Sequence, residues 1–119
     1  MKILYARVST DKQSVDRQIE SEDNYDVVIT DKGISGSIPF FDRPHSDKLI
    51  QYLESGEVKQ LDVHSIDRLG RNLKDILITI EKIHSYDVSI YIISQGLLTL
   101  DKETGEINPT TKLILSVMG

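Results

Sequence analysis

Four short segments that are apolar on both faces alternate along this chain with segments of helical periodicity. The apolar segments are residues 3–7, 26–30, 60–64 and 88–93. Apolar residues recur at helical spacing in residues 15–19, 49–53 and 73–83. A strand that is apolar on both faces is typical of a parallel sheet covered from both sides. The alternation predicts an α/β fold with a three-layer, mostly parallel sheet and helices on both faces, whose sites form beyond the carboxyl ends of the strands.

Proline, glycine and asparagine mark the expected boundaries of the helices. Pro44 suits a first helical turn and Gly56 a helix end. Asn108 can cap a final helix whose first turn holds Pro109. The apolar face of that helix, in residues 113–118, has barely begun where the chain stops, which suggests a fragment of a longer protein.

Two polar stretches predict connections between these elements. Residues 31–39 are rich in glycine and serine, which favours either a mobile loop beside the site or an ordinary surface connection. Residues 101–106 predict a tight polar turn around Gly105.

Length and composition indicate a single soluble domain. A chain of 119 residues suits one hydrophobic core. It has no cysteine, so it forms no disulfide or thiolate metal site, which fits a reducing cytosol. No apolar run approaches the ~20 residues of a membrane span, and a charge comes too early for a signal peptide. We therefore expect a cytoplasmic protein.

The overall charge is acidic. The net charge is −5, and acids gather in residues 20–31, which include Asp31, and again in residues 101–106. The simplest interpretation of both runs is a solvated face. Nonspecific affinity for DNA comes mainly from lysine and arginine that neutralise phosphates. If DNA is the partner, another segment is needed to hold it strongly.

Arginine, in contrast, is scarce and concentrated. The five arginines are residues 7, 17, 43, 68 and 71. Three of them lie in two clusters where strands are expected to end, residues 5–13 and 67–71. The first cluster places Ser9 just past a strand, two residues after Arg7. Because the planar guanidinium fork fits phosphate oxygens, the pattern indicates phosphate chemistry with Ser9 as the nucleophile.

A serine nucleophile needs activation, and no base for Ser9 is obvious. A triad of Ser9, His64 and Asp67 can be drawn, but the short spacing of its last two members arises as easily by accident, and His64 can be an ordinary strand residue. The alternative is that the three clustered arginines surround one phosphate and stabilise both the serine alkoxide and the pentacoordinate transition state without a metal.

The arginines also have structural interpretations. Arg68 and Arg71 can form ion pairs with Asp67 or Asp75 at the entry to a helix, and Arg7 can lie at a surface strand end. A P-loop nucleotide site is not supported, because the chain has no glycine-rich segment of the required pattern.

Several motifs together resemble a known family. They are Tyr-Ala-Arg-Val-Ser-Thr at 5–10 with Gln13 and Gln18, Gly-Ile-Ser-Gly at 33–36, Arg-Pro at 43–44, Asp-Arg-Leu-Gly-Arg at 67–71, and residues 113–119. In this order they resemble the catalytic domain of the resolvase/invertase serine recombinases over essentially the whole chain.

The resemblance implies a transesterification on DNA. Ser9 would attack a phosphodiester, form a 5'-phosphoserine link and free a 3'-hydroxyl, with strands exchanged before religation. Because each step trades one phosphoester for another, no ATP, metal or other cofactor is implied. The partners would be double-stranded DNA and further subunits, since the family acts as dimers that pair into tetramers.

The same resemblance implies roles for particular residues. Four arginines would grip the scissile phosphate: Arg7, Arg68, Arg71 and, from the mobile segment, Arg43. Asp67 would organise the arginines or assist proton transfer. Gln13 and Gln18 would position the serine loop. Tyr5 would support the site or simply pack.

Two features depart from the family. Ser65 stands where relatives often carry lysine, which would shift the local electrostatics. The long oligomerising helix and the DNA-binding domain that the family places beyond this point are absent, so residues 1–119 alone are not expected to recombine DNA. Two rival functions remain open: a catalytically silent assembly or regulatory module of the same fold, and a serine-dependent phosphoesterase.

Overall fold

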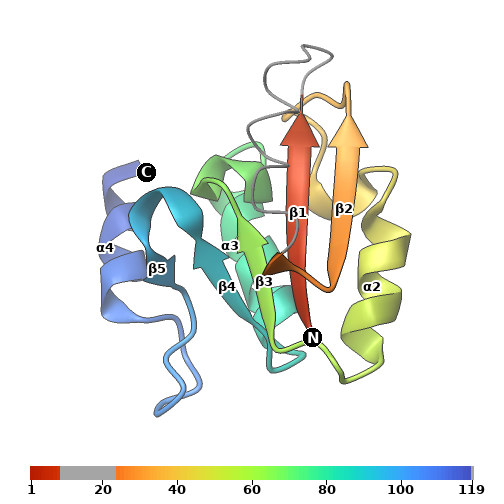
Figure 1. The fold of residues 1–119 in the computed structure, drawn as a ribbon. Helices are drawn as coiled ribbons and strands as arrows, with labels where there is room; N and C mark the ends of the chain where they lie inside the picture. Colours follow the sequence, from red (N-terminus) through yellow and green to blue (C-terminus); the bar gives the residue numbers. More distant parts are fainter. Residues whose placement is uncertain (9–23, 119) are drawn as a thin grey trace.

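A computed structural model of the chain describes residues 1–8 and 24–118. These residues form a five-stranded sheet in the order β2-β1-β3-β4-β5 (Figure 1). The pairs β1–β2, β1–β3 and β3–β4 are parallel, and only β5 runs antiparallel to its neighbour. The predicted mostly parallel α/β sheet is therefore confirmed.

The strands are β1 (Lys2–Val8), β2 (Val27–Lys32), β3 (Gln60–Val63), β4 (Ser89–Ile92) and β5 (Leu97–Leu98). The α-helices in the described part of the chain are α2 (Ser46–Glu54), α3 (Leu73–His84) and α4 (Pro109–Met118). Short 3-10 helices span Phe40–Asp42 (η2), Ile66–Leu69 (η3) and Ile93–Gln95 (η4).

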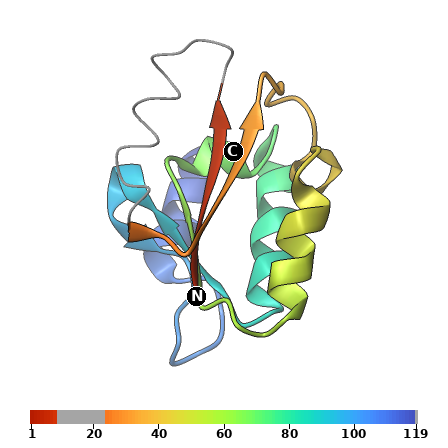
Figure 2. The same cartoon turned by 45° about the vertical axis from the view of Figure 1, so that its right-hand side comes forward.

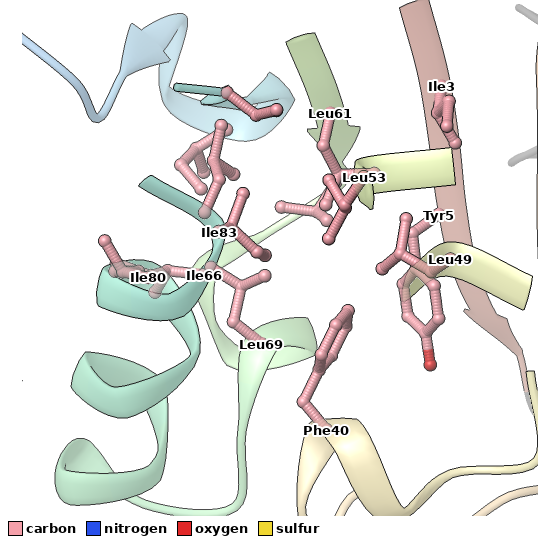
Figure 3. Packing of buried hydrophobic residues seen from close by; sticks show 14 of the residues in the cluster. Ile3, Tyr5, Phe40, Leu49, Leu53, Leu61, Ile66, Leu69, Ile80 and Ile83 are labelled. Carbon is pink, nitrogen blue, oxygen red and sulfur yellow. The ribbon is translucent and has the colours of Figure 1, made fainter. Parts of the chain in front are cut away.

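The main hydrophobic core lies between the sheet and helices α2 and α3. Figure 2 shows both helices on the same side of the sheet. Ile3 and Tyr5 of β1 point into this core together with Leu49 of α2 and Ile83 of α3, and all four are nearly inaccessible to solvent (Figure 3). Their burial holds β1 firmly against both helices.

The opposite face of the sheet is buried as well. Leu4 and Ala6 alternate with the core residues along β1 and are each 4% exposed. Asp62 of β3 is 1% exposed and accepts a hydrogen bond of 2.7 Å from the Tyr25 hydroxyl. Burial of alternate residues on both faces is the pattern that the sequence predicted for the central strands.

Several predicted boundaries are confirmed. Gly56 follows the end of α2 with a φ of +77°, a conformation that favours glycine. Asn108 caps α4, because its side-chain oxygen accepts a hydrogen bond of 2.7 Å from the Thr111 backbone. Residues 101–106 form the predicted turn, closed by the Asp101 N–H donating to the Glu106 carbonyl at 2.8 Å.

Other boundaries were predicted wrongly. Pro44 precedes α2 instead of lying in its first turn, because the His45 backbone N–H is bound by Asp31 and His45 keeps a non-helical conformation. Strand β2 continues through Asp31 and Lys32, which pair with β1, so the loop begins at residue 33. The sequence analysis also missed β5 and the three 3-10 helices found in the described residues. The helix expected at residues 15–19 lies outside the described residues.

None of the helices described is long and apolar enough to cross a membrane.

Candidate functional site

Several of the predicted site residues gather at the carboxyl edge of the parallel strands. Arg7 is the penultimate residue of β1 and pairs with Asp31 of β2. Arg68 lies in η3, which follows β3, and Arg43 caps the end of η2. Parallel strands bring their carboxyl ends to one edge, which is why clusters far apart in sequence meet here.

Arg43 is the most deeply buried of these arginines. It is 1% exposed, and it donates hydrogen bonds to the Ile38 carbonyl at 3.0 Å, to the Tyr5 hydroxyl at 3.2 Å and to the Arg68 carbonyl at 2.5 Å. The Phe40 ring lies 5.4 Å from its guanidinium carbon. Arg43 therefore ties the 33–45 connection to both arginine clusters, and this part of the connection is anchored.

Tyr5 links Arg43 to a buried carboxylate. The Tyr5 hydroxyl donates to Asp31 at 2.7 Å and accepts from Arg43. Burial, and after it the hydrogen bond to Asp31, raises the pKa of Tyr5 above its usual range, so the phenol stays protonated. Tyr5 thus packs in the core and also binds both Asp31 and Arg43 through its hydroxyl.

Asp31 corrects an expectation from the sequence. It was assigned to a solvated acidic face, but it is fully buried. One carboxylate oxygen accepts from Tyr5, and the other accepts from the backbone N–H of His45 at 3.2 Å and contacts the His45 ring nitrogen Nδ1. A signal was available, because strand alternation from Ile29 places Asp31 on the core side of the sheet, near the carboxyl end.

Arg7 lies close to the guanidinium groups of Arg43 and Arg68. Its Nη1 donates to the Ile34 carbonyl at 3.2 Å, and a side-chain carbon at Gly36 would lie only 3.2 Å from its Nη2. Partial burial, followed by the positive charges of Arg68 and Arg43, lowers the pKa of Arg7. Because a nearby positive charge disfavours a second one, the effect of Arg68 and Arg43 on this pKa indicates that the three guanidinium groups lie close together.

The 65–71 segment supplies the more open side of the site. Asp67 accepts from the Ser65 hydroxyl and lies 3.6 Å from Nη1 of Arg68, so the predicted ion pair of Arg68 with Asp67 exists. Arg71 has an exposed side chain, and it is its backbone N–H, not its guanidinium, that donates to Asp75 at 3.0 Å. The structure therefore brings Arg7, Arg43 and Arg68 together and leaves the Arg71 side chain facing solvent.

Three guanidinium nitrogens in this cluster lack a hydrogen-bond partner among the described residues. They are Arg7 Nε, Arg43 Nη2 and Arg68 Nε, and all three are buried. Buried donors are normally satisfied, so unpaired donors on three clustered arginines are an unusual feature of this edge of the sheet.

Some predicted site residues lie outside the described structure, and the described contacts do not support the alternative triad. Ser9, Gln13 and Gln18 lie outside the described residues. Of the alternative triad, His64 is exposed just after β3, and the described contacts of the Asp67 carboxylate are to Ser65 and Arg68 instead of His64. The sequence analysis missed His45 as a partner of Asp31.

Fold and site geometry together define an α/β domain with a cluster of arginines at the carboxyl edge of its sheet. The family model described as "Resolvase, N terminal domain" matches residues 2–119, so the chain belongs to the resolvase N-terminal domain family. This confirms the resemblance drawn from the motifs.

Individual relatives support this family assignment. The Transposon Tn501 resolvase of Pseudomonas aeruginosa is 37% identical over 118 residues, which are 99% of this chain and 58% of that protein. The chain thus spans little more than half the length of such relatives. A solved serine recombinase from Sulfolobus solfataricus is 30% identical with a TM-score of 0.55, over 98% of this chain and 78% of that one. The N-terminal catalytic domain of TP901-1 integrase shares the fold, with a TM-score of 0.68 at 23% identity over 99% and 91% of the chains.

Proposed function

We propose that this chain is the catalytic domain of a site-specific DNA recombinase that cleaves and rejoins double-stranded DNA. Ser9 Oγ attacks the phosphorus of a phosphodiester, a P–Oγ bond forms, the P–O3' bond breaks, and the 3'-oxygen leaves with a proton. After strand exchange, a 3'-hydroxyl attacks the 5'-phosphoserine and releases Ser9. Bond energy is conserved at each step, so the reaction takes no ATP.

One observation carries the proposal. Three adjacent arginines present buried, unpartnered N–H groups within the part of the chain that is described, and Ser9 directly follows Val8, the last residue of β1. A pentacoordinate phosphorane carries more negative charge than the phosphodiester, so preorganised guanidinium groups stabilise the transition state more than the ground state.

The proposal assigns a role to each predicted residue. Arg7, Arg68 and Arg71 bind the scissile phosphate, and the buried Arg43 both supports the site and contributes Nη2. Asp67 orients Arg68, with which it forms an ion pair, or moves a proton.

Three further assignments complete the site. Tyr5 orients Arg43 through its hydroxyl. Gln13 and Gln18 position the serine loop.

The rest of the reaction calls for a larger assembly. We propose that the full protein carries an oligomerising helix and a DNA-binding domain beyond residue 119, and that it forms dimers that pair into tetramers on DNA. The acidic net charge of −5 supports this, because phosphate neutralisation by this domain alone would be weak. Residues 1–119 by themselves would then not recombine DNA, and the full protein would act on DNA in the cytoplasm.

The test uses the full product of the gene and end-labelled DNA from the region around that gene. Reactions are stopped with denaturant, and the wild-type protein is compared with Ser9→Ala. We expect a protein adduct on the 5' ends of the DNA that protease shortens and that Ser9→Ala abolishes.

Two results would contradict the proposal. An adduct that persists in Ser9→Ala would exclude Ser9 as the nucleophile. The absence of any adduct on DNA that the protein demonstrably binds would favour a silent assembly module, or, if a small phosphoester is hydrolysed, a phosphoesterase.

A further inference from the structure

Asp31 is a fully buried carboxylate close to Arg43, whose guanidinium group has the proposed role of binding the phosphate. Through Tyr5, Asp31 is one hydrogen bond away from Arg43. A buried carboxylate with too few donors attracts the nearest positive group. If Asp31 paired directly with Arg43, it would take the guanidinium donors that the site needs.

His45 supplies the donors that prevent this pairing. Its backbone N–H and its ring nitrogen Nδ1 both bind Oδ1 of Asp31, while Tyr5 binds Oδ2. An ionised carboxylate only accepts hydrogen bonds, so with Asp31 ionised Nδ1 is the nitrogen that carries the proton. The side chain of His45 is 48% exposed, and His45 is the N-cap residue of α2.

With the hydrogen bonds of Asp31 supplied by Tyr5 and His45, Arg43 keeps one guanidinium nitrogen without a partner. Its Nε and Nη1 bind Ile38, Tyr5 and Arg68, whereas Nη2 is buried and has no partner among the residues described. No hydrogen bond joins Arg43 to Asp31 directly within the described structure, although both bind the same phenol. Removal of the His45 ring would therefore leave Asp31 with one donor fewer and favour its direct pairing with Arg43.

We propose that His45 is a positioning residue: by binding Asp31, its ring keeps Tyr5 and Arg43 in place and leaves Nη2 of Arg43 free for a phosphate oxygen. His45 touches no reacting atom and acts through Asp31 and Tyr5. The inference rests on the proposed function for its catalytic consequence, but its structural part concerns Arg43 alone.

The test compares His45→Ala with His45→Asn. Asparagine places the donor Nδ2 close to the position of Nδ1, so it should replace the lost hydrogen bond, whereas alanine removes it. Gln51→Ala is the matched control, because Gln51 is an exposed residue of the same helix. Each variant is made in the full gene product and, for spectroscopy, labelled with 15N.

The first measurement is the NMR signal of the Arg43 Nε–H group, which the Ile38 carbonyl protects in the wild type. We expect His45→Ala to shift or broaden this signal and His45→Asn to restore it. The second measurement is the rate of adduct formation on DNA, which we expect to fall about 10-fold in His45→Ala and to stay within about 2-fold of wild type in His45→Asn and Gln51→Ala.

The inference is overturned if His45→Ala keeps both the Arg43 signal and the wild-type rate. It is also overturned if His45→Asn loses as much as His45→Ala, since the ring would then act only by filling space. If the wild-type protein forms no adduct, the proposed recombinase function fails, and the Arg43 signal still decides the role of His45.

Discussion

The two arginine-bearing sides of the site are held in different ways. Arg43 is buried, donates to three partners and is held by the Tyr5–Asp31–His45 network. The 67–71 side is more open: Arg68 has 22% of its side chain exposed, and the Arg71 side chain faces solvent. The contrast shows that arginines of one cluster can have very different environments. It predicts that substitutions at Arg43 mainly lower stability, whereas substitutions at Arg71 mainly lower the proposed activity.

The largest effect is expected at Arg43. Arg43→Ala leaves the Ile38 and Arg68 carbonyls and the Tyr5 hydroxyl without a donor in the interior, so the free energy of unfolding should fall by about 3 kcal/mol. Urea denaturation of the chain measures this value. Arg43→Lys, which keeps the charge but lacks the fork, should lose a smaller amount, and a loss of under ~1 kcal/mol in Arg43→Ala would show that the buried network is not structural.

Arg71 should show the opposite behaviour. Arg71→Ala is expected to slow adduct formation on DNA by about 100-fold, because it removes a donor to the phosphate in the transition state. Since the side chain is exposed, the free energy of unfolding should change by less than ~0.5 kcal/mol. If Arg71→Ala unfolded as easily as Arg43→Ala, the distinction between the two sides would not hold.

Gly70 tests how the open side is positioned. A side-chain carbon at Gly70 would lie 2.7 Å from Oδ2 of Asp75 and 2.8 Å from the Ile76 backbone nitrogen. Gly70→Ala should therefore cost about 2 kcal/mol of stability and displace Arg71, whose backbone N–H binds the same carboxylate, so that adduct formation slows as well.

Gly56→Ala is the control for this substitution, since it meets no atom within 4 Å but has a positive φ. It should cost about 1 kcal/mol and leave adduct formation unchanged. Equal effects of the two substitutions on adduct formation would contradict a specific role for the close packing at Gly70.

The smallest effect is expected at Tyr5. Tyr5→Phe removes the hydroxyl shared by Asp31 and Arg43 and should lower the free energy of unfolding by about 1 kcal/mol. The pKa of Tyr5 is raised in the folded state above its usual 10.0, so the neutral phenol contributes stability below about pH 10 and that contribution is lost as the pH rises further.

Denaturation at about pH 8 and about pH 10.5 should therefore show a steeper loss of stability in the wild type than in Tyr5→Phe. Tyr25 also has a raised pKa, from burial and its bond to Asp62, so Tyr25→Phe serves as the comparison. An unchanged pH slope in Tyr5→Phe would mean that the phenol ionises equally in both states.

Much of the fold was predictable because it rests on local patterns. Apolar runs of five or six residues with intervening helical spacing specify a parallel α/β sheet. Asn108, Pro109 and Gly56 mark their helix ends through local backbone chemistry. The two-residue strand β5 was missed because it lacks a pattern of its own and is defined by its pairing with β4.

The site was predictable in part. Arg7, Arg43, Arg68, Asp67 and Tyr5 were named from the sequence, and the described structure gathers them at one edge of the sheet. Their environments were not predictable, because burial depends on what other segments cover. Arg43 was expected on a mobile segment, yet it is the most buried arginine described.

The sequence by itself determined the class of fold, the family and the residue types available for phosphate chemistry, because periodicity and motif order are properties of the linear chain. Only the tertiary structure decided that Asp31 is buried, that His45 satisfies it, and that Arg43 and Arg71 occupy opposite environments. Desolvation and hydrogen-bond partners are set by contacts between residues distant in sequence, and these arise only when β1, β2 and the 66–71 segment come together.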